Sequence, residues 1–336
     1  MQFRFFSQRV HLALLMVSAI YGFFYVAVKL LLVEVSAESL LWLRFVLSAM
    51  ILMPIEWLVF KSRIPLSDML KIIGLSLLGV YLVQMALVVG VGMTTSFYAS
   101  LVMASVPIIT LLMGILFRKE FFRWQKLLGM LLGFTGVAVV LSAKSAGTHL
   151  AGIAGQTVFQ GNLYVIGAAL CFALFLFLSQ SLLKRYRAFT VTAYSYLVSA
   201  IAISLPYNGF FLDAPGAPMS SVDYLVLSPK AWALLAFIVI GASILTYLLN
   251  NYALKRTSPT VVSVYMFLAP VQAAIWGYWI LGEPFTLWMG IAALLTFTGI
   301  IIANQSPDQQ VDMTSIASQD ALIDLNQPEI EAIARK

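Results

Sequence analysis

The sequence predicts an all-α polytopic membrane protein, with ten transmembrane helices arranged as two inverted five-helix repeats. Three observations predict this fold class: an apolar composition, long continuous apolar runs, and an internal repeat in which one copy of a connector carries basic residues and the other copy lacks them. Hydrophobic residues make up 61% of the 336 residues and charged residues only 10%, against about 45–50% and about 25% in typical globular domains. A water-soluble domain of this size could not bury so much apolar surface, so the expected solvent is lipid.

The apolar runs indicate helices rather than barrel strands. Only helices and closed barrels satisfy the backbone in lipid, and barrel strands alternate over about ten residues, which these runs do not. A helix needs about 20 mostly apolar residues to cross a bilayer. The first run is too long for the hydrophobic part of a signal peptide, so we interpret it as a retained first span. The expected spans are 10–32, 38–60, 69–91, 95–117, 122–142, 162–182, 190–207, 231–253, 259–281 and 285–304.

Basic residues predict the orientation of these spans, because Lys and Arg are in excess on the cytoplasmic side. The odd-numbered connectors hold only Lys144 and Lys230. Both termini are therefore expected in the cytoplasm, and the chain in the plasma (inner) membrane. The basic residues assigned to the cytoplasmic side are Arg4, Arg9, Lys61, Arg63, Lys71, Arg118, Lys119, Arg123, Lys126, Lys184, Arg185, Arg187, Lys255, Arg256, Arg335 and Lys336.

An internal repeat appears when residues 94–142 are shifted by 163 positions, because they align with the second half without a gap. Leucine matches are common in such a composition, so other residue types carry the argument. The informative matches are Pro107 with Pro270, Gly114 with Gly277, Glu120 with Glu283 and Phe122 with Phe285.

The two copies of one connector differ in charge. "GILFRKEFF" at 114–122 contains Arg118 and Lys119, whereas "GYWILGEPF" at 277–285 contains no basic residue. Five helices per repeat is an odd number, so the second repeat enters the membrane from the opposite side. The positive-inside rule then places basic residues in one copy and removes them from the other. Inverted repeats are a recurring design of secondary transporters, with the substrate site near mid-membrane between the repeats.

Several motifs resemble those of the EamA-type ten-helix exporters of the drug/metabolite transporter superfamily. The first span ends near Lys29, "LRF" at 43–45 opens the second span, and "LGEPFT" at 281–286 is the closest local match. The first copy departs from the pattern with "RKEFF" at 118–122. The resemblance covers residues 10–304. It implies export of small metabolites, such as amino acids or their derivatives, by alternating access through a cavity among spans one, three, four, six, eight and nine.

The same alignment divides the chain. Its parts are a cytoplasmic N-terminus (1–9), a first five-helix repeat (10–142), an external connector (143–161), a second, inverted repeat (162–304) and a polar cytoplasmic tail (305–336) expected to be disordered.

Polar and aromatic residues within the spans form the predicted substrate site. Buried amides are costly in lipid and usually face the interior of a helix bundle. Tyr21, Tyr25 and Lys29 are spaced four apart, so they share one helix face. Each residue could instead serve interhelical hydrogen bonding or, for Lys29, reach the headgroups. The predicted substrate-binding residues are Tyr21, Tyr25, Lys29, Gln84, Gln180, Tyr247, Asn250, Asn251, Tyr265, Gln272 and Trp276.

A second set of residues is assigned to structure and gating. Arg44 lies about 10 Å into its span, with Glu38 as a candidate partner, and acts as a clamp or as a cavity charge. Pro107 and Pro270 are expected to kink their helices. Glu120 and Glu283 start helices, where an acid favours the helix dipole. Glu56, near the inner end of span two, is expected to pair with a basic residue.

The sequence contains no pattern typical of an enzyme. It shows neither a metal-spaced His cluster nor a P-loop, so no cofactor, metal or nucleic-acid partner is expected. The expected partners are a small-molecule substrate and the lipid bilayer, with the chain as a monomer or homodimer. Proton coupling and facilitated diffusion both remain open. The alternative functions are a sugar-nucleotide or other organic-anion carrier and a non-transporting membrane scaffold or sensor.

Overall fold

A computed structural model describes residues 2–94, 96–117, 124–142, 155–205 and 227–282, together with scattered positions between 287 and 302. The all-α fold class is confirmed, since these residues form helices and connectors without a strand. Seven of the described helices are long and apolar enough to cross a membrane, and Ala188–Ser204 is a shorter apolar helix. The predicted spans 122–142 and 285–304 are described only in part.

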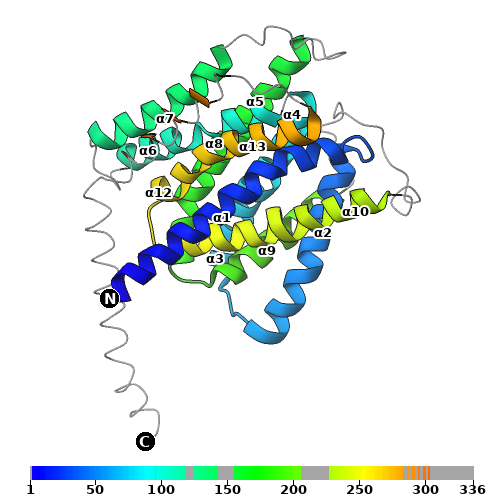
Figure 1. The fold of residues 1–336 in the computed structure, drawn as a ribbon. Helices are drawn as coiled ribbons and strands as arrows, with labels where there is room; N and C mark the ends of the chain where they lie inside the picture. The colour runs from blue at the N-terminus through cyan, green and yellow to red at the C-terminus, as the bar shows by residue number, and fades with distance from the viewer. Residues whose placement is uncertain are drawn as a thin grey trace, which may run out of the picture.

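The helices of the first repeat follow the predicted spans closely (Figure 1). The first helix starts earlier than predicted, and spans three and four are each built from more than one helical segment. The segments are α1 (Gln2–Leu31), α2 (Ala37–Ile55), η1 (Glu56–Phe60), α3 (Leu66–Ser76), η2 (Leu77–Leu82), α4 (Val83–Met93), α5 (Ser96–Met103), α6 (Val106–Leu116) and α7 (Trp124–Ser142).

The second repeat has the same construction. The helix of span six begins at Gly155, so residues 155–161 of the predicted connector are helical. The segments are α8 (Gly155–Leu183), α9 (Ala188–Ser204), α10 (Pro229–Ala236), η5 (Phe237–Leu245), α11 (Thr246–Leu254), α12 (Pro259–Val264), η6 (Tyr265–Phe267), α13 (Leu268–Trp276) and η7 (Gly277–Leu281).

The two repeats pack into each other rather than side by side. Helix α1 lies against α11 and α13, α2 lies against α9, and α4 lies against α8. Figure 1 shows α1 running beside α13. Glycines permit the closest approaches, since a Cβ at Gly90 would meet the carbonyl oxygen of Gly161 at 2.8 Å. The centre of the bundle is therefore lined by elements of both repeats.

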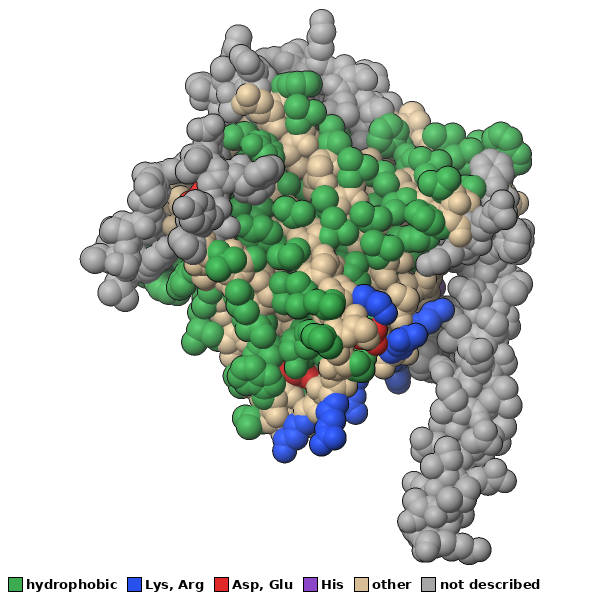
Figure 2. All heavy atoms as spheres, turned by 180° about the vertical axis from the view of Figure 1, so that it is seen from behind, with side chains coloured by type: hydrophobic (Ala, Val, Ile, Leu, Met, Phe, Trp, Pro, Cys, Tyr) green, Lys and Arg blue, Asp and Glu red, His purple; other side chains and the backbone are tan. Residues whose placement is uncertain are grey.

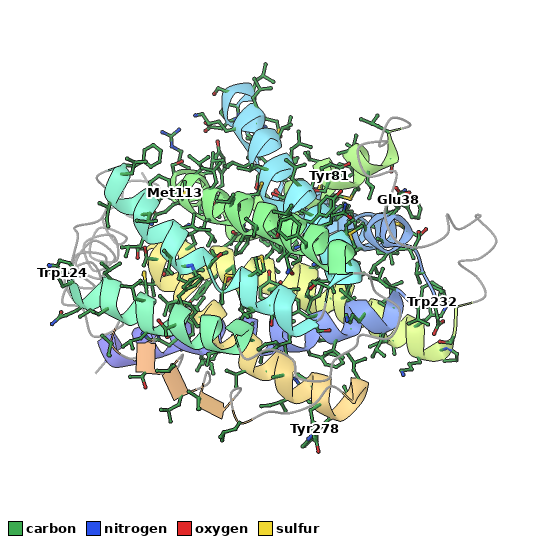
Figure 3. All side chains as sticks on the ribbon, turned by 90° about the horizontal axis from the view of Figure 1, so that it is seen from above. Glu38, Tyr81, Met113, Trp124, Trp232 and Tyr278 are labelled. Carbon is green, nitrogen blue, oxygen red and sulfur yellow. The ribbon has the colours of Figure 1, made fainter. Side chains whose placement is uncertain are left out.

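The exterior suits a bilayer. Hydrophobic side chains cover the visible flank, and basic side chains gather at one end (Figure 2). Trp124, Trp232 and Tyr278 lie near helix ends and point away from the bundle (Figure 3). Amphipathic aromatic rings of this kind are typical of the two membrane–water interfaces.

Helix breaks occur next to Pro107 and Pro270. Helix α5 ends at Met103 and α6 begins at Val106, while η6 (Tyr265–Phe267) is a 3₁₀ turn between α12 and α13. Proline lacks a backbone donor and its ring clashes with the carbonyl four residues earlier, which is Met103 in one repeat and Met266 in the other. The predicted kinks thus appear as short breaks just before each proline.

The sequence analysis did not anticipate the π-helical turns. Spans three and eight widen into η2 and η5, and regular helix resumes at Val83 and Thr246, which are 163 residues apart. The repeat offset found for residues 94–142 therefore extends back to Leu66 and Pro229, where the two spans begin. π-Turns inside helices are rare and often lie at functional sites.

Candidate functional site at the centre of the two repeats

The guanidinium of Arg44 is fully buried at the meeting point of α2, α4 and η5. Its Nε donates to the Ser243 hydroxyl at 2.5 Å. One terminal nitrogen donates to the Gln84 Oε1 at 2.6 Å, and the other donates to the Ala242 carbonyl at 3.1 Å. The Cζ atom of the guanidinium also lies 4.9 Å from the centre of the Phe24 ring, a cation–π distance. Arg44 therefore joins three elements through neutral partners.

No carboxylate of the described residues lies within ion-pair distance of Arg44. The predicted pairing with Glu38 is wrong, because the side chain is held by a hydroxyl, an amide and a carbonyl instead. These partners can satisfy N–H groups, but they carry no negative charge to balance the guanidinium.

The network continues from Gln84 into the second repeat. The Gln84 side-chain amide donates to the Tyr247 hydroxyl at 3.3 Å, and that hydroxyl donates to the Gly79 carbonyl at 2.8 Å. Gln84 and Tyr247 occupy equivalent positions of the two repeats, 163 residues apart. Gly79 in η2 and Ala242 in η5 are equivalent in the same way. In each repeat the carbonyl of the π-turn thus accepts a hydrogen bond from a side chain of the other repeat: Gly79 from Tyr247, and Ala242 from Arg44.

A narrow cavity opens beside this network. Its lining comes from spans one, six, eight and nine, and the polar groups at its surface are hydroxyls and one amide, that of Asn250 in span eight. In this conformation it has room for little more than a water molecule. The lining residues are Val17, Ser18, Tyr21, Tyr25, Phe172, Asn250, Val262, Tyr265, Met266 and Ala269.

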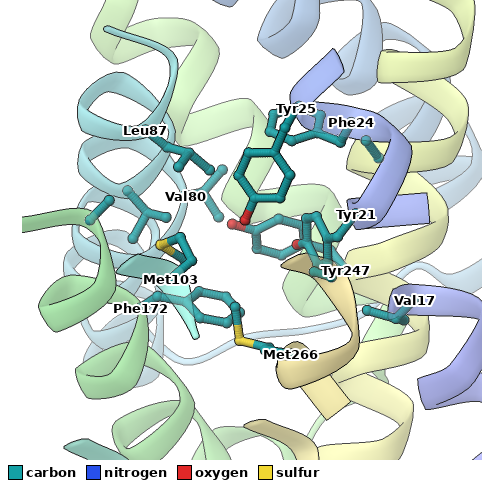
Figure 4. Close-up of a cluster of buried hydrophobic side chains, with 14 of the residues drawn as sticks. Val17, Tyr21, Phe24, Tyr25, Val80, Leu87, Met103, Phe172, Tyr247 and Met266 are labelled. Carbon is teal, nitrogen blue, oxygen red and sulfur yellow. The ribbon is translucent and has the colours of Figure 1, made fainter. Parts of the chain in front are cut away.

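Three tyrosine hydroxyls lie close together beside this cavity, and two of the tyrosines, Tyr21 and Tyr25, line it. Figure 4 shows the hydroxyls of Tyr21, Tyr25 and Tyr247 close together, with Met103, Phe172 and Met266 in the same cluster of buried side chains. All three tyrosines are at least nine-tenths buried. Four of the predicted site residues, Tyr21, Tyr25, Asn250 and Tyr265, therefore line one cavity, and Gln84 and Tyr247 belong to the adjacent network.

The other predicted site residues lie elsewhere. Asn251 donates to Thr192 on α9 at 2.9 Å, and Gln180 donates to the Thr257 carbonyl at 3.1 Å. Gln272 packs against Gly22 of α1, with its buried side-chain oxygen unpartnered among the described residues. Lys29 and Trp276 do not line the cavity, and Trp276 packs on Phe23 with 5.5 Å between ring centres.

Of the residues assigned to structure and gating, the structure describes the two prolines but not the two glutamates. Pro107 and Pro270 are buried beside the helix breaks. Glu120 and Glu283 lie outside the described residues, so their predicted helix-start role stays a prediction.

His11 contacts a cavity residue, and the sequence analysis missed it. Its ring Nδ1 is hydrogen-bonded to the hydroxyl of Tyr265, which lines the cavity. His11, Ser18 and Tyr25 are spaced seven apart, so they share one face of α1. That spacing was the available signal, because the same face carries Ser18 and Tyr25 into the cavity.

Acidic residues near the basic end of the bundle make local contacts. Asp68 pairs with Lys71 at 2.9 Å and with Arg185 at 3.5 Å, and it accepts a hydrogen bond from Tyr186. That hydrogen bond raises the pKa of the Tyr186 hydroxyl. Asp68 thus ties the start of α3 to the connector between α8 and α9.

Glu56 is buried and, among the described residues, has no basic partner, so the expected ion pair is wrong. Its carboxylate accepts from the Thr190 hydroxyl at 3.0 Å and from the Ser62 backbone N–H at 3.4 Å. The Ser62 and Thr190 hydroxyls are also 3.0 Å apart. Hydroxyls and a backbone amide therefore hold the contact between η1 and α9.

Replacing Thr190 with valine is expected to lower the free energy of unfolding by about 1–3 kcal/mol, because the buried carboxylate loses its shortest hydrogen bond. Thermal unfolding of the full chain in lipid nanodiscs measures the change. Thr135→Val is the control, since the Thr135 hydroxyl is exposed and bonds only to its own helix. Equal unfolding temperatures for the two variants would contradict the assigned role of Thr190.

Comparisons with known proteins agree with this architecture. The model of the EamA-like transporter family matches residues 8–142 and 159–305. An uncharacterized transporter of Archaeoglobus fulgidus is 26% identical over 307 residues, which is 90% of this chain and 100% of the relative. The uncharacterized transporter YyaM of Bacillus subtilis is 25% identical, over 80% of this chain and 84% of the relative.

Two more distant matches add a named activity and a solved fold. An S-adenosylmethionine uptake transporter of Rickettsia felis is 25% identical, over 55% of each chain. One protein of known crystal structure superposes with a TM-score of 0.68 at 18% identity, covering 88% of this chain and 96% of its own. That likeness concerns the fold alone. With both of its halves matched by the family model, the chain belongs to the EamA-like transporter family.

Proposed function

We propose that this family member is a secondary transporter that exports small metabolites, such as amino acids or their derivatives, by alternating access. The observation that carries the proposal is the cavity between the repeats, with walls from spans one, six, eight and nine. Its tyrosine, methionine and phenylalanine side chains suit an apolar part of a small molecule, and Asn250 and the hydroxyls suit a polar part.

Alternating access needs elements that can change shape on either side of the site. The helix breaks before Pro107 and Pro270 lie at equivalent positions of the two repeats, and η6 carries the cavity residues Tyr265 and Met266. A broken helix bends at lower cost than a continuous one, since fewer backbone hydrogen bonds resist the change. We therefore propose these breaks as the hinges that close the cavity on one side and open it on the other.

The direction and membrane orientation belong to the same proposal. Basic side chains gather at one end of the molecule (Figure 2), and we assign that end and both termini to the cytoplasm by the positive-inside rule. The inner membrane is the proposed location, with the chain acting as a monomer or homodimer.

Untargeted metabolite profiling of cells and medium tests this function. Cells expressing the wild type are compared with cells expressing Asn250→Ala, which removes the cavity amide, at equal membrane abundance. Ser179→Ala is the matched control, because the Ser179 hydroxyl is buried on α8, lies outside the cavity and has no hydrogen-bond partner among the described residues. We expect one compound class to accumulate in the medium with the wild type and the control only.

Other outcomes are equally informative. Equal export by Asn250→Ala and wild type would remove the cavity from the pathway. Accumulation of a compound inside the cells would show uptake and overturn export. An unchanged distribution of every compound would overturn the transport proposal for these conditions.

A further inference from the structure

Arg44 is a buried cation without a counter-charge among the described residues. Its side chain is completely inaccessible to solvent, and its three hydrogen-bond partners are neutral. A charged residue at this depth in a membrane costs about 2.5–3.5 kcal/mol on insertion scales, and buried charges are normally paired with an opposite charge. An anion supplied from outside the chain would remove this imbalance.

The surroundings of Arg44 have spare hydrogen-bonding capacity. A guanidinium carries five N–H groups, of which three donate to Ser243, Gln84 and Ala242. The hydroxyl of Tyr196, a completely buried side chain, lies beside Arg44 and Ser243 without a well-formed hydrogen bond to any described residue. A buried hydroxyl left unpartnered costs about 1–3 kcal/mol, so this group also favours an incoming acceptor.

The site communicates with the cavity through Tyr21. Tyr21 lines the cavity, and its ring packs edge-on against Phe24 with 6.2 Å between ring centres, while the Phe24 ring lies 4.9 Å from the Arg44 Cζ. The Tyr247 hydroxyl lies next to that of Tyr21 (Figure 4) and joins the Arg44 network through Gln84. The Tyr21 and Phe24 rings thus connect the cavity to the guanidinium.

We infer that Arg44 and Tyr196 form a binding site for the carboxylate group of the transported substrate. This inference rests on the proposed function and adds a chemical class to it: the substrate carries a carboxylate on an apolar, cavity-filling body. The planar fork of arginine matches a carboxylate with two parallel hydrogen bonds. Tyr196 donates its hydroxyl to the same group.

Carboxylate binding also acts on the π-turns. The arriving anion binds the unused N–H groups of Arg44 and competes with the neutral acceptors Gln84 and Ala242, because its negative charge attracts the guanidinium more strongly than a neutral oxygen does. The Ala242 carbonyl in η5 then loses its bond to Arg44. Gln84, which donates to Tyr247, loses its bond to Arg44 as well, so the contacts between the repeats loosen. Substrate binding thereby favours the change of conformation that transport requires.

Matched pairs of small molecules test this site directly. The full-length chain in lipid nanodiscs is titrated with phenylacetate and N-acetyl-L-phenylalanine, each compared with its neutral amide, phenylacetamide and N-acetyl-L-phenylalaninamide. The wild type, Tyr196→Phe, Arg44→Gln and the control Ser179→Ala are compared by thermal unfolding, with sodium chloride as an inorganic anion. Binding of a ligand to the folded state raises the unfolding temperature in a saturable way.

We expect at least one carboxylate, but neither amide, to raise the unfolding temperature of the wild type and of Ser179→Ala. Tyr196→Phe should weaken the binding of that carboxylate about tenfold to a hundredfold, since one hydrogen bond to a charged group contributes about 1.5–3 kcal/mol. It should leave the ligand-free unfolding temperature unchanged, because its hydroxyl has no partner to lose. Arg44→Gln should abolish the response.

Several results would overturn the inference. They are equal responses to acid and amide, a full response in Arg44→Gln, a chloride response equal to that of the carboxylates, or no response to either acid up to about 10 mM, a concentration that covers millimolar affinities. If carboxylates bind but no compound is exported, the export proposal fails and the binding site stands. If the exported compound lacks a carboxylate, the binding site fails and the export proposal stands.

Discussion

Replacing Arg44 with methionine is expected to reduce export at least about tenfold, which corresponds to about 1.4 kcal/mol of lost interaction with the substrate. The same change should lower the free energy of unfolding by about 1–3 kcal/mol, because the Gln84 Oε1 loses its buried donor. Ser243 and Ala242 keep other hydrogen bonds, to Ile238 and Thr246 respectively. Efflux of the compound identified by profiling and thermal unfolding in nanodiscs measure the two effects.

A double variant separates folding from transport. In Arg44→Met/Gln84→Met both partners of the Arg44–Gln84 hydrogen bond are apolar, and replacing both members of a buried pair is close to neutral for stability. We therefore expect the unfolding temperature to recover while export stays at the level of the single variant. Wild-type export by the double variant would show that Arg44 is only a structural clamp.

Arg44→Lys supplies a further comparison. Lysine keeps the positive charge but offers a compact ammonium instead of a planar fork. It cannot reach Ser243, Gln84 and Ala242 with separate N–H groups in fixed directions. Export is expected to fall to a level between those of the wild type and Arg44→Met, and full activity would show that charge alone suffices.

Replacing Gly79 with alanine is expected to destabilise the fold by about 1–3 kcal/mol, the usual cost of overpacking a core. A Cβ at this position would overlap the ring of Phe175 on α8, which is almost completely buried. The strain falls on the π-turn whose carbonyl accepts from Tyr247, so export should fall as well. The unfolding temperature in nanodiscs and efflux at equal membrane abundance are the measurements.

The same span contains the control. A Cβ at Gly74 would meet no atom within 4 Å, so Gly74→Ala should be neutral or stabilising by up to about 1 kcal/mol, the difference in helix propensity. Phe175→Leu should relieve part of the strain in Gly79→Ala, which a double-mutant cycle detects as a favourable coupling. Equal stabilities of Gly74→Ala and Gly79→Ala would contradict the close packing of η2 on α8.

The sequence was informative about what depends on composition and periodicity. Span length and apolar content predict helices because the bilayer leaves the backbone no other partner. The match of Pro107 with Pro270 predicts two repeats. The basic residues that follow the first proline and are missing after the second predict that the repeats are inverted. The helix breaks then follow from the chemistry of proline, which acts on its own helix and needs no tertiary contact.

The candidate site was predictable only in part. Tyr21 and Tyr25 were found from their shared helix face, and Asn250 and Tyr265 from the cost of polar groups in lipid. Asn251 and Gln180 carry the same signal but bond to Thr192 and to the Thr257 carbonyl. Polarity shows that a side chain avoids lipid, and it does not distinguish a cavity wall from a helix contact.

The sequence by itself determined that this chain is a two-repeat helical membrane protein and which side chains had to avoid lipid. Only the tertiary structure showed that Arg44 has neutral partners and that η2 and η5 present equivalent carbonyls at the centre. The physical reason is the distance along the sequence between the residues that interact. Helix formation and membrane insertion depend on residues within one span, whereas the environment of Arg44 is set by Ser243 and Ala242, which lie 199 and 198 residues away in the sequence.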